Sequence, residues 1–416
     1  MKKLGLIAVI VAIGTIGTTH AQSPFTLEWH GFVNPHYYAD SRSVVGGRED
    51  MMLFYPKPIL RDSLGRDLND GWQADMLAIT ARLNLRINGP DMLGAKTSAF
   101  IEGDFTGSTN ATINNLRLRH AYIDMRWEHH RLLAGQYWYG MVIHEIMPMT
   151  NPLNMGAPFH CYARQPQVRY EYHVGGIEAV AVAQWQLDNM SQGLLDGLPQ
   201  SSTQFARHSL VPELNLQVRW NIGALFFGYA ANLKTIQPVV PAPTGQLHSS
   251  FSYTLFGKYT GKAVTVKAQA LLNNSLYEGC SMGGYLLRTY TADPSQYAFR
   301  DWHFDTYWLD LERNKGHWRP GIFLGYGHNR DFGTPLSTGT VTDYALGRGF
   351  NLEYLWRVQP RLTYTTLTGL SFTAEAEYTR AAYGHEVTVG PDRINEHDPD
   401  GSVGNLRLSL SMVYAF

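Results

Sequence analysis

Apolar and polar residues alternate strictly over the last twelve residues of the chain, from Asn405 to Phe416. Successive side chains of a β-strand point to opposite faces, so this alternation predicts a strand with one wholly apolar face. The stretch is longer than a typical globular strand and close to the roughly 9–11 residues that a tilted strand needs to cross a bilayer. Its apolar face must therefore be covered by another layer of the protein or by lipid.

The same two-residue period recurs along the chain and predicts an all-β protein of about sixteen strands. The expected strands are 26–38, 76–88, 95–106, 115–127, 130–138, 166–173, 176–187, 212–220, 223–233, 248–259, 262–273, 300–312, 317–328, 350–365, 370–382 and 404–416. Two stretches are ambiguous. The parity of 116–124 switches around His120, where a β-bulge would restore it, and 302–312 is unclear in the same way.

Short and long connections alternate between these strands. The long ones are expected at 40–74, 139–165, 188–211, 234–247, 274–299, 329–349 and 383–403, with a shorter one at 107–114. Tight turns rich in glycine and asparagine separate them. This alternation is typical of a transmembrane antiparallel up-and-down β-barrel with short periplasmic turns and long extracellular loops. We expect residues 22–416 to form that barrel.

The positions of the arginines indicate which face is the interior. In 79–88, Arg82 and Arg86 lie between apolar residues of the opposite face. An arginine facing lipid at mid-membrane costs roughly 2–4 kcal/mol. The strand arginines are therefore expected to point into a wet, polar interior.

The first residues predict export. Lys2 and Lys3 precede an apolar run, and small residues follow up to Ala21. This pattern indicates a signal peptide at 1–21, cleaved after Ala21, with no helical membrane span later in the chain. The net charge of −1 gives no support to nucleic-acid binding, and charged residues make up only 17% of the chain, which suits a barrel.

Motifs of catalysis and metal binding are weak in this sequence. Residues 279–283 match G-x-S-x-G, but they lie in an expected loop, whereas a nucleophile elbow needs a strand before it and a helix after it. No cluster of carboxylates or cysteines completes a ligand set around His129 and His130, so a solvated pair is favoured over a metal site. We expect no catalytic residue, no cofactor and no metal. Cys161 and Cys280 are expected to be free thiols or, alternatively, to form a disulfide between two loops.

Three stretches resemble the trimeric outer-membrane porins of the DcaP-like type, which are related to the phosphate-selective porins. They are Ala81–Phe105, Leu116–Trp138 and Pro148–Tyr172, which contain the motifs Glu-Gly-Asp-Phe, Leu-Arg-Leu-Arg-His-Ala-Tyr and Gly-Gln. The resemblance implies a sixteen-stranded homotrimer whose third long loop, here 139–165, folds into the lumen and constricts the pore. It also implies passage of small anionic solutes such as dicarboxylates or phosphate, although no ladder of lysines is present.

Inward-facing charges supply the candidate pore residues. We expect the pore lining to include Arg82, Arg86, Arg117, Arg119, Arg126, Arg169, Glu102, Asp104, Glu171 and Arg164. Opposed charges across a constriction bias ion selectivity, and arginine suits carboxylate and phosphate groups. Two interpretations stay open. The arginines and carboxylates either pair to stabilise the wall, or Arg82, Arg86, Arg117 and Arg119 form a basic surface facing the inserted loop.

The sequence therefore predicts a porin in the outer membrane of a Gram-negative bacterium, a passive channel that favours small anions. It is expected to contact outer-membrane lipid and to be recognised by the barrel-assembly machinery through Phe416. The alternatives are a barrel enzyme, such as a lipid hydrolase with a serine, a histidine and a carboxyl group near the membrane boundary, and an adhesive or structural barrel.

Overall fold

The computed structural model describes residues 24–151, 154–241, 245–273, 275–289, 297–338, 342–389 and 392–416. The expected signal peptide at 1–21 lies outside these residues. Among the described residues, no helix is both long and apolar enough to cross a bilayer. The one α-helix assigned there is the short α1 (Gln204–Ser209).

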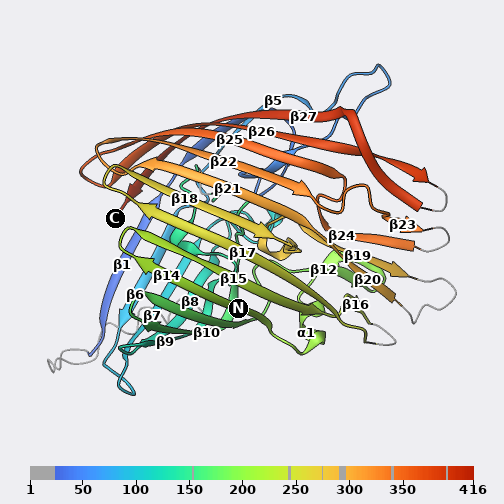
Figure 1. Cartoon of the computed structure of the whole chain (residues 1–416). Helices are drawn as coiled ribbons and strands as arrows, with labels where there is room; N and C mark the ends of the chain where they lie inside the picture. The colour runs from blue at the N-terminus through green and yellow to red at the C-terminus, as the bar shows by residue number, and fades with distance from the viewer. Residues whose placement is uncertain are drawn as a thin grey trace, which may run out of the picture.

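The chain folds into a closed antiparallel barrel of sixteen strands (Figure 1), which confirms the predicted fold class. The first two wall strands are each interrupted. β1 (Thr26–Val33) continues as β2 (His36–Arg42), and β5 (Asp70–Leu77) continues as β6 (Arg82–Asn88). The others are β7 (Lys96–Asp104), β8 (Arg117–Arg126), β9 (His130–Trp138), β10 (Arg164–Val174), β11 (Ile177–Gln184), β14 (Glu213–Ile222), β15 (Leu225–Ile236), β17 (His248–Thr260), β18 (Val264–Leu272), β21 (Phe304–Arg313), β22 (Trp318–Asn329), β25 (Leu352–Thr365), β26 (Leu370–Val389) and β27 (Asp392–Ala415).

The barrel closes where the last strand meets the first. β27 pairs with β1 at Phe32 and with β2 from His36 to Asp40. At the end of the chain, Phe416 and Gly31 exchange two backbone hydrogen bonds of 2.9 and 3.0 Å. A Cβ at position 31 would lie 2.9 Å from the Phe416 ring and 2.5 Å from the Arg82 carbonyl oxygen, so glycine allows the terminal ring to pack over the seam.

The wall alternates as the sequence predicts. On β14, Leu216 is 63% exposed on the outer face, whereas its neighbours Asn215 and Gln217 are buried inside. The predicted bulge in 116–124 is also present, because the β7–β8 register shifts between Glu102 and Gly103. The other ambiguous stretch, 302–312, lies mostly in β21, which begins at Phe304.

Several expected boundaries are wrong. The segment 383–403, predicted as a loop, is a continuation of the β26–β27 hairpin, paired from Gly384 to Val389. Residues 300–302 belong to a separate strand, and β5 begins at Asp70 rather than at residue 76. The long loops also carry strands of their own, at the end of the barrel opposite Phe416 (Figure 1): β12 (Gln192–Leu195), β13 (Leu198–Ser201), β16 (Val239–Val240), β19 (Gly283–Thr289), β20 (Tyr297–Trp302), β23 (Ser337–Thr338) and β24 (Thr342–Arg348). We call this the long-loop end.

Three connections fold inside the barrel. The first is 139–163, whose backbone is bonded by the opposite wall: Arg357 donates to the Ala157 carbonyl at 2.8 Å, and Asn151 N–H donates to Glu375 at 3.1 Å. The second is the hairpin of β3 (Val44–Gly47) and β4 (Met52–Pro56), which lies within the loop predicted at 40–74. The third is the segment around η3 (Tyr277–Gly279), where Gly279 accepts a bond from Tyr162 N–H.

The interior is less wet than predicted. The wall is polar, but the inserted segments bring a buried apolar cluster into its centre, including Met52 and Phe54 of the hairpin and Ile143 and Phe159 of 139–163. The alternation of residues along strands does not predict this cluster, because the apolar residues that fill the lumen lie in the connections between strands.

Candidate functional site

The charged part of the lumen depends on the bulge in β8. Glu102 faces His120 and Gly103 faces Leu118, so Arg119 is the extra residue between them. A bulge places two successive residues opposite one. As a result, Arg119 and His120 both lie buried inside the barrel together with Arg117, while Leu118 between the two arginines is 49% exposed on the outside.

Four arginines and three carboxylates gather at this point, and we call them the arginine cluster. Its members are Arg82, Arg117, Arg119, Arg164, Glu102, Asp104 and Asp188. Arg119 donates to Glu102 and to Asp104, each at 2.7 Å, and Arg117 donates twice to Asp104 at 3.1 Å. The other pairs are longer: Arg82–Glu102 is 3.8 Å, Arg117–Asp188 is 3.5 Å and Arg164–Asp188 is 3.6 Å. With every one of these groups ionised, the cluster has a net charge of +1.

Arg164 enters the cluster because the inserted loop ends at β10. It is the first residue of that strand and pairs with Trp138, the last residue of β9. Its guanidinium lies 4.1 Å from the centre of the Trp138 ring and 4.9 Å from that of Tyr162. Such stacking fixes the planar group while leaving its edge able to donate.

Tyr162 stands at the centre of the arginines. Its phenol oxygen accepts from Arg164 at 3.0 Å and from Arg119 at 3.3 Å. Burial by itself raises the pKa of this phenol, but Arg164, Arg119 and Arg117 outweigh it and lower the pKa of Tyr162 to about 7. The phenol can therefore change the charge of the cluster near neutral pH.

The cluster holds donors that the protein does not use. Among the described residues, Nε of Arg82, Nη2 of Arg119 and Nε of Arg164 are buried without a hydrogen-bond partner. Buried polar groups normally have partners, so unused N–H groups on cations mark a place where water or an anion completes the bonding.

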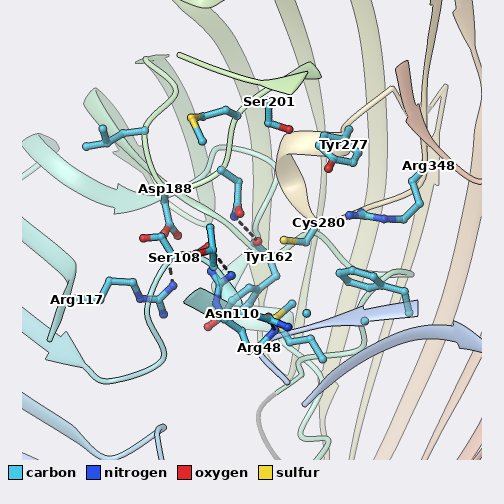
Figure 2. A pocket seen from close by; sticks show the side chains of 18 residues that line it. Arg48, Ser108, Asn110, Arg117, Tyr162, Asp188, Ser201, Tyr277, Cys280 and Arg348 are labelled. Carbon is cyan, nitrogen blue, oxygen red and sulfur yellow. Dashed lines mark hydrogen bonds and ion pairs between the residues drawn. The ribbon is translucent and has the colours of Figure 1, made fainter. Parts of the chain in front are cut away.

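An open cavity of about 370 Å³ adjoins the cluster (Figure 2). Arg117 and Asp188 lie on one side of it, and Arg348 with Tyr277 lies on the other. Arg48, Met52, Arg117 and Tyr162 also line a gap of about 10 Å³ that reaches Arg82 and Arg119. A gap of that size is at the lower limit for one water molecule, so the inserted segments and the wall pack closely around the arginine cluster.

A second charged group lies toward the short turns. Asp124 bonds Arg131 at 2.8 Å and Arg126 at 2.9 Å, and Glu171 bonds Arg169 at 2.5 Å. Ligand atoms of Glu171, His173 and Glu178 also lie within 4.8 Å of one another, the geometry of a possible metal site. Three arginines oppose a cation there, because Arg131 and Arg169 contact Glu171 and Arg219 lies 3.5 Å from Glu178.

The predicted pore residues thus fall into three places. Arg82, Arg117, Arg119, Arg164, Glu102 and Asp104 meet in the arginine cluster, whereas Arg126, Arg169 and Glu171 belong to the second group. Arg86 lies apart, with its guanidinium 5.5 Å from the centre of the Phe100 ring. The charges of the arginine cluster pair with one another and also face Tyr162 of the inserted loop.

Several residues of the site were not singled out from the sequence. Asp188, Tyr162, Arg48 and Arg348 come from connections, where no periodic signal indicates which side chains turn inward. A tyrosine two residues before an inward-facing arginine was the one available hint, because the two share a face of an extended chain.

The described residues do not support a nucleophile elbow or a loop-to-loop disulfide. Residues 277–279 form a 3-10 turn in place of the required strand, and Ser281 donates to the Pro158 carbonyl at 3.0 Å. Cys161 and Cys280 are free thiols in this structure.

One group of catalytic residue types does come together at the long-loop end. His248 Nε2 lies 2.8 Å from Asp301 and 3.3 Å from Ser250 Oγ, and Ser250 donates to Asp301 at 2.6 Å. In a catalytic triad, different ring nitrogens bond the serine and the carboxylate. Here one nitrogen faces both groups, so the arrangement ties β17 to β20 and does not activate the serine.

No family model matches the chain, and no curated protein sequence matches it. Among solved structures, it is similar to the outer membrane channel DcaP of Acinetobacter baumannii, with a TM-score of 0.67 and 17% identity over 97% of this chain and 100% of that one. The fold is that of an outer-membrane porin.

Two further porin structures share the fold. An anion-selective porin from Comamonas acidovorans has a TM-score of 0.54 and 9% identity, and covers 94% of this chain and 100% of its own. The trimer form of OmpT, an outer membrane protein of Vibrio cholerae, has a TM-score of 0.50 and 10% identity, and covers 95% and 100%. The expected resemblance to DcaP-like porins is confirmed for the fold, and the inserted segments and arginine cluster are features of this porin barrel.

Proposed function

We propose that this protein is a passive outer-membrane channel for small hydrophilic solutes and that it favours anions. The observation that carries the proposal is the arginine cluster, a net positive group with unused guanidinium donors at the narrow part of a porin barrel. Fixed charges at a constriction bias ion selectivity. The similarity to an anion-selective porin of the same fold supports the sign of that selectivity.

Reversal potentials test this function. In planar bilayers with a potassium chloride gradient, the wild-type channel should favour chloride. The double change of Arg82→Gln and Arg164→Gln should shift the reversal potential toward potassium. It removes two positive charges from the arginine cluster and leaves the carboxylates of the cluster in place. Arg66→Gln removes an exposed charge paired with Asp62 and should cause no shift. A wild-type preference for potassium, or a double variant that matches the wild type, would contradict the proposal.

The surrounding assembly belongs to the same proposal. The apolar outer face fits lipid, and export by a signal peptide at 1–21 fits insertion into an outer membrane by the barrel-assembly machinery, with Phe416 as its recognition residue. A homotrimer is supported by the trimeric OmpT structure of similar fold. Three-fold conductance steps, together with a trimer mass for the detergent-purified protein, are the expected results, and a monomer with single steps would contradict this part alone.

A further inference from the structure

The outer face of β26 carries an arginine. Alternate residues of this strand from Phe372 to Tyr378 are apolar and point away from the lumen, and Arg380 continues the same row. Its side chain is exposed, whereas Thr379 and Ala381 on either side of it are buried. An arginine that faces lipid is costly at the middle of a bilayer and tolerated near the head groups. The depth of Arg380 in the membrane therefore decides what surrounds it.

Aromatic side chains place Arg380 at the level of the lipid head groups. It lies ten residues after the first residue of β26, and ten residues of a tilted strand span about 25 Å of membrane, the height of the apolar band. At the end of the short turns, the Trp318 and Tyr364 ring centres are 4.8 Å apart. Beside Arg380, those of Trp356 and Tyr378 are 5.4 Å apart. Aromatic belts of this kind mark both membrane interfaces, so Arg380 lies at the outer one.

The Arg380 guanidinium has N–H groups left for a ligand. Its Nε donates to Ser402 Oγ of β27 at 2.7 Å. Within the part of the chain that the structure describes, Nη1 and Nη2 have no hydrogen-bond partner. Glu353 of β25 does not supply one, because its carboxylate is bonded to His397 at 2.6 Å. Two adjacent N–H groups can hold a phosphate through a pair of charge-assisted bonds.

Toward the middle of the bilayer, the same surface is hollowed. A groove of about 530 Å³ opens on the outer wall and crosses β25, β26 and β27, which lie side by side (Figure 1). Its lining includes Leu362, Tyr364, Phe372, Ala374, Leu410 and Met412. Ala374 is the small residue between two larger ones, since it pairs with Leu362 on one side and with Leu410 on the other. A lining of this composition favours hydrocarbon as its occupant.

We propose that this surface binds a phosphorylated lipid of the outer leaflet, with its phosphate on Arg380 and Ser402 and one acyl chain in the groove at Ala374. Arg380 and Ala374 are six residues apart in one row, about 15 Å across the membrane for a tilted strand. That is half of the roughly 30 Å hydrocarbon core, the depth that the acyl chains of one leaflet reach. Free phosphate would bond the arginine but leave the groove empty.

Native mass spectrometry of the detergent-purified full chain tests this site. The probes are phosphatidic acid, diacylglycerol with the same acyl chains, and inorganic phosphate. Phosphatidic acid should bind at least about tenfold more tightly than diacylglycerol, because only its head group can bond the guanidinium. An equal concentration of inorganic phosphate should not displace it, because phosphate has no acyl chain. Displacement by phosphate would contradict the role of the groove.

Two variants separate the head-group contact from the groove. Arg380→Gln should weaken phosphatidic acid binding by about tenfold or more, the effect of losing a charge-assisted pair of bonds. Ala374→Trp fills the groove without altering Arg380 and should also abolish binding. Arg393→Gln is the matched control. It removes a half-exposed arginine of the same hairpin, 3.3 Å from Glu386, and should leave binding unchanged.

Equal binding of phosphatidic acid and diacylglycerol, or unchanged phosphatidic acid binding in either Arg380→Gln or Ala374→Trp, would overturn the site. A second copy of the chain in the groove would also overturn it. Ala374→Trp would then break up the oligomer and leave lipid binding unchanged.

The site goes beyond the proposed channel function and can fail separately from it. Arg380 lies outside the barrel, so Arg380→Gln should leave the reversal potential of the channel as it is in the wild type. A shifted reversal potential would mean that Arg380 faces the lumen, and would overturn the site. A wild-type channel without anion preference would contradict the proposed function and leave the lipid site standing.

Discussion

β8 carries one residue more than its neighbour opposite Glu102 and Gly103, so inward-facing residues of both parities reach the lumen from this strand. Without the extra residue, Arg117 and Arg119 could not share the interior with His120, Tyr122 and Asp124. One inserted residue thus lets the same strand contribute both to the arginine cluster and to the group near the short turns. The local cost of an unpaired ladder position is offset by the bonds from Arg119 to Glu102 and Asp104.

Tyr162 leads to a prediction about pH. Its pKa is about 7, so the phenol is neutral below that pH and negative above it. The net charge of the arginine cluster and Tyr162 together should fall from +1 to zero as the pH rises through about 7, and chloride preference should weaken. Reversal potentials measured on either side of neutrality should show this change in the wild type.

Tyr162→Phe is the matched control for this change. It keeps the ring that Arg164 stacks on but removes the ionisable oxygen. Its chloride preference should hold across the same pH range. The same pH dependence in the Phe variant would show that another group titrates.

At the scale of elements, the lumen is narrowed by more than the third long loop. The β3–β4 hairpin is anchored by three neighbouring wall strands, β25, β26 and β27. Arg357 donates to the Leu53 and Phe54 carbonyls at 3.0 and 3.2 Å, and Arg407 donates to the Met51 carbonyl at 3.1 Å. Tyr383 adds a bond of 2.7 Å to the Pro56 carbonyl. Arginines of the wall strands therefore hold the apolar hairpin inside the barrel through hydrogen bonds to its backbone carbonyl oxygens.

Removing this hairpin should widen the channel. Replacing residues 44–56 by a short glycine–serine linker should raise single-channel conductance, because the segment fills the lumen beside the arginine cluster. Shortening the loop at 61–66, which is largely exposed, is the control and should leave conductance as it is. Unchanged conductance after hairpin removal would mean that solutes pass by another route.

At the scale of the whole molecule, closure depends on the pairing of β27 with β1 and β2, which ends at the contact between Gly31 and Phe416. The carboxyl-terminal strand would otherwise leave an unpaired edge, the usual starting point for aggregation. The two backbone bonds at Gly31 complete the ring of strands at its last residue. A closed barrel has no edge strand, so it exposes no row of unpaired backbone N–H and C=O groups to lipid.

A side chain at position 31 should disturb this closure. Gly31→Val places atoms where the Phe416 ring and the Arg82 carbonyl lie, and should lower the free energy of unfolding by about 1–3 kcal/mol, as overpacking does. Denaturant titration followed by heat-modifiable migration on gels measures this change. Gly47→Val is the control, since nothing lies within 4 Å of its added Cβ. Equal stability of the two variants would contradict the role of this contact.

The sequence by itself determined the wall of this protein. A strand pairs with its neighbour by backbone bonds and alternates its faces, so both strand count and inward arginines such as Arg82 and Arg219 follow from a two-residue period. The cluster could be predicted in part for the same reason, since Arg117, Arg119, Glu102 and Asp104 lie on wall strands.

Only the tertiary structure decided what fills that wall. Asp188, Tyr162 and Arg348 lie in connections or in strands formed within them. The β3–β4 hairpin is held by Arg357 and Arg407, which are 304 and 356 residues away in the chain from the carbonyls of Leu53 and Met51 that they bond. Such contacts have no local period, because they depend on where a folded connection meets the far side of the barrel. The arginine cluster and the cavity beside it therefore form where distant segments pack together. Alternation along a strand does not encode that packing.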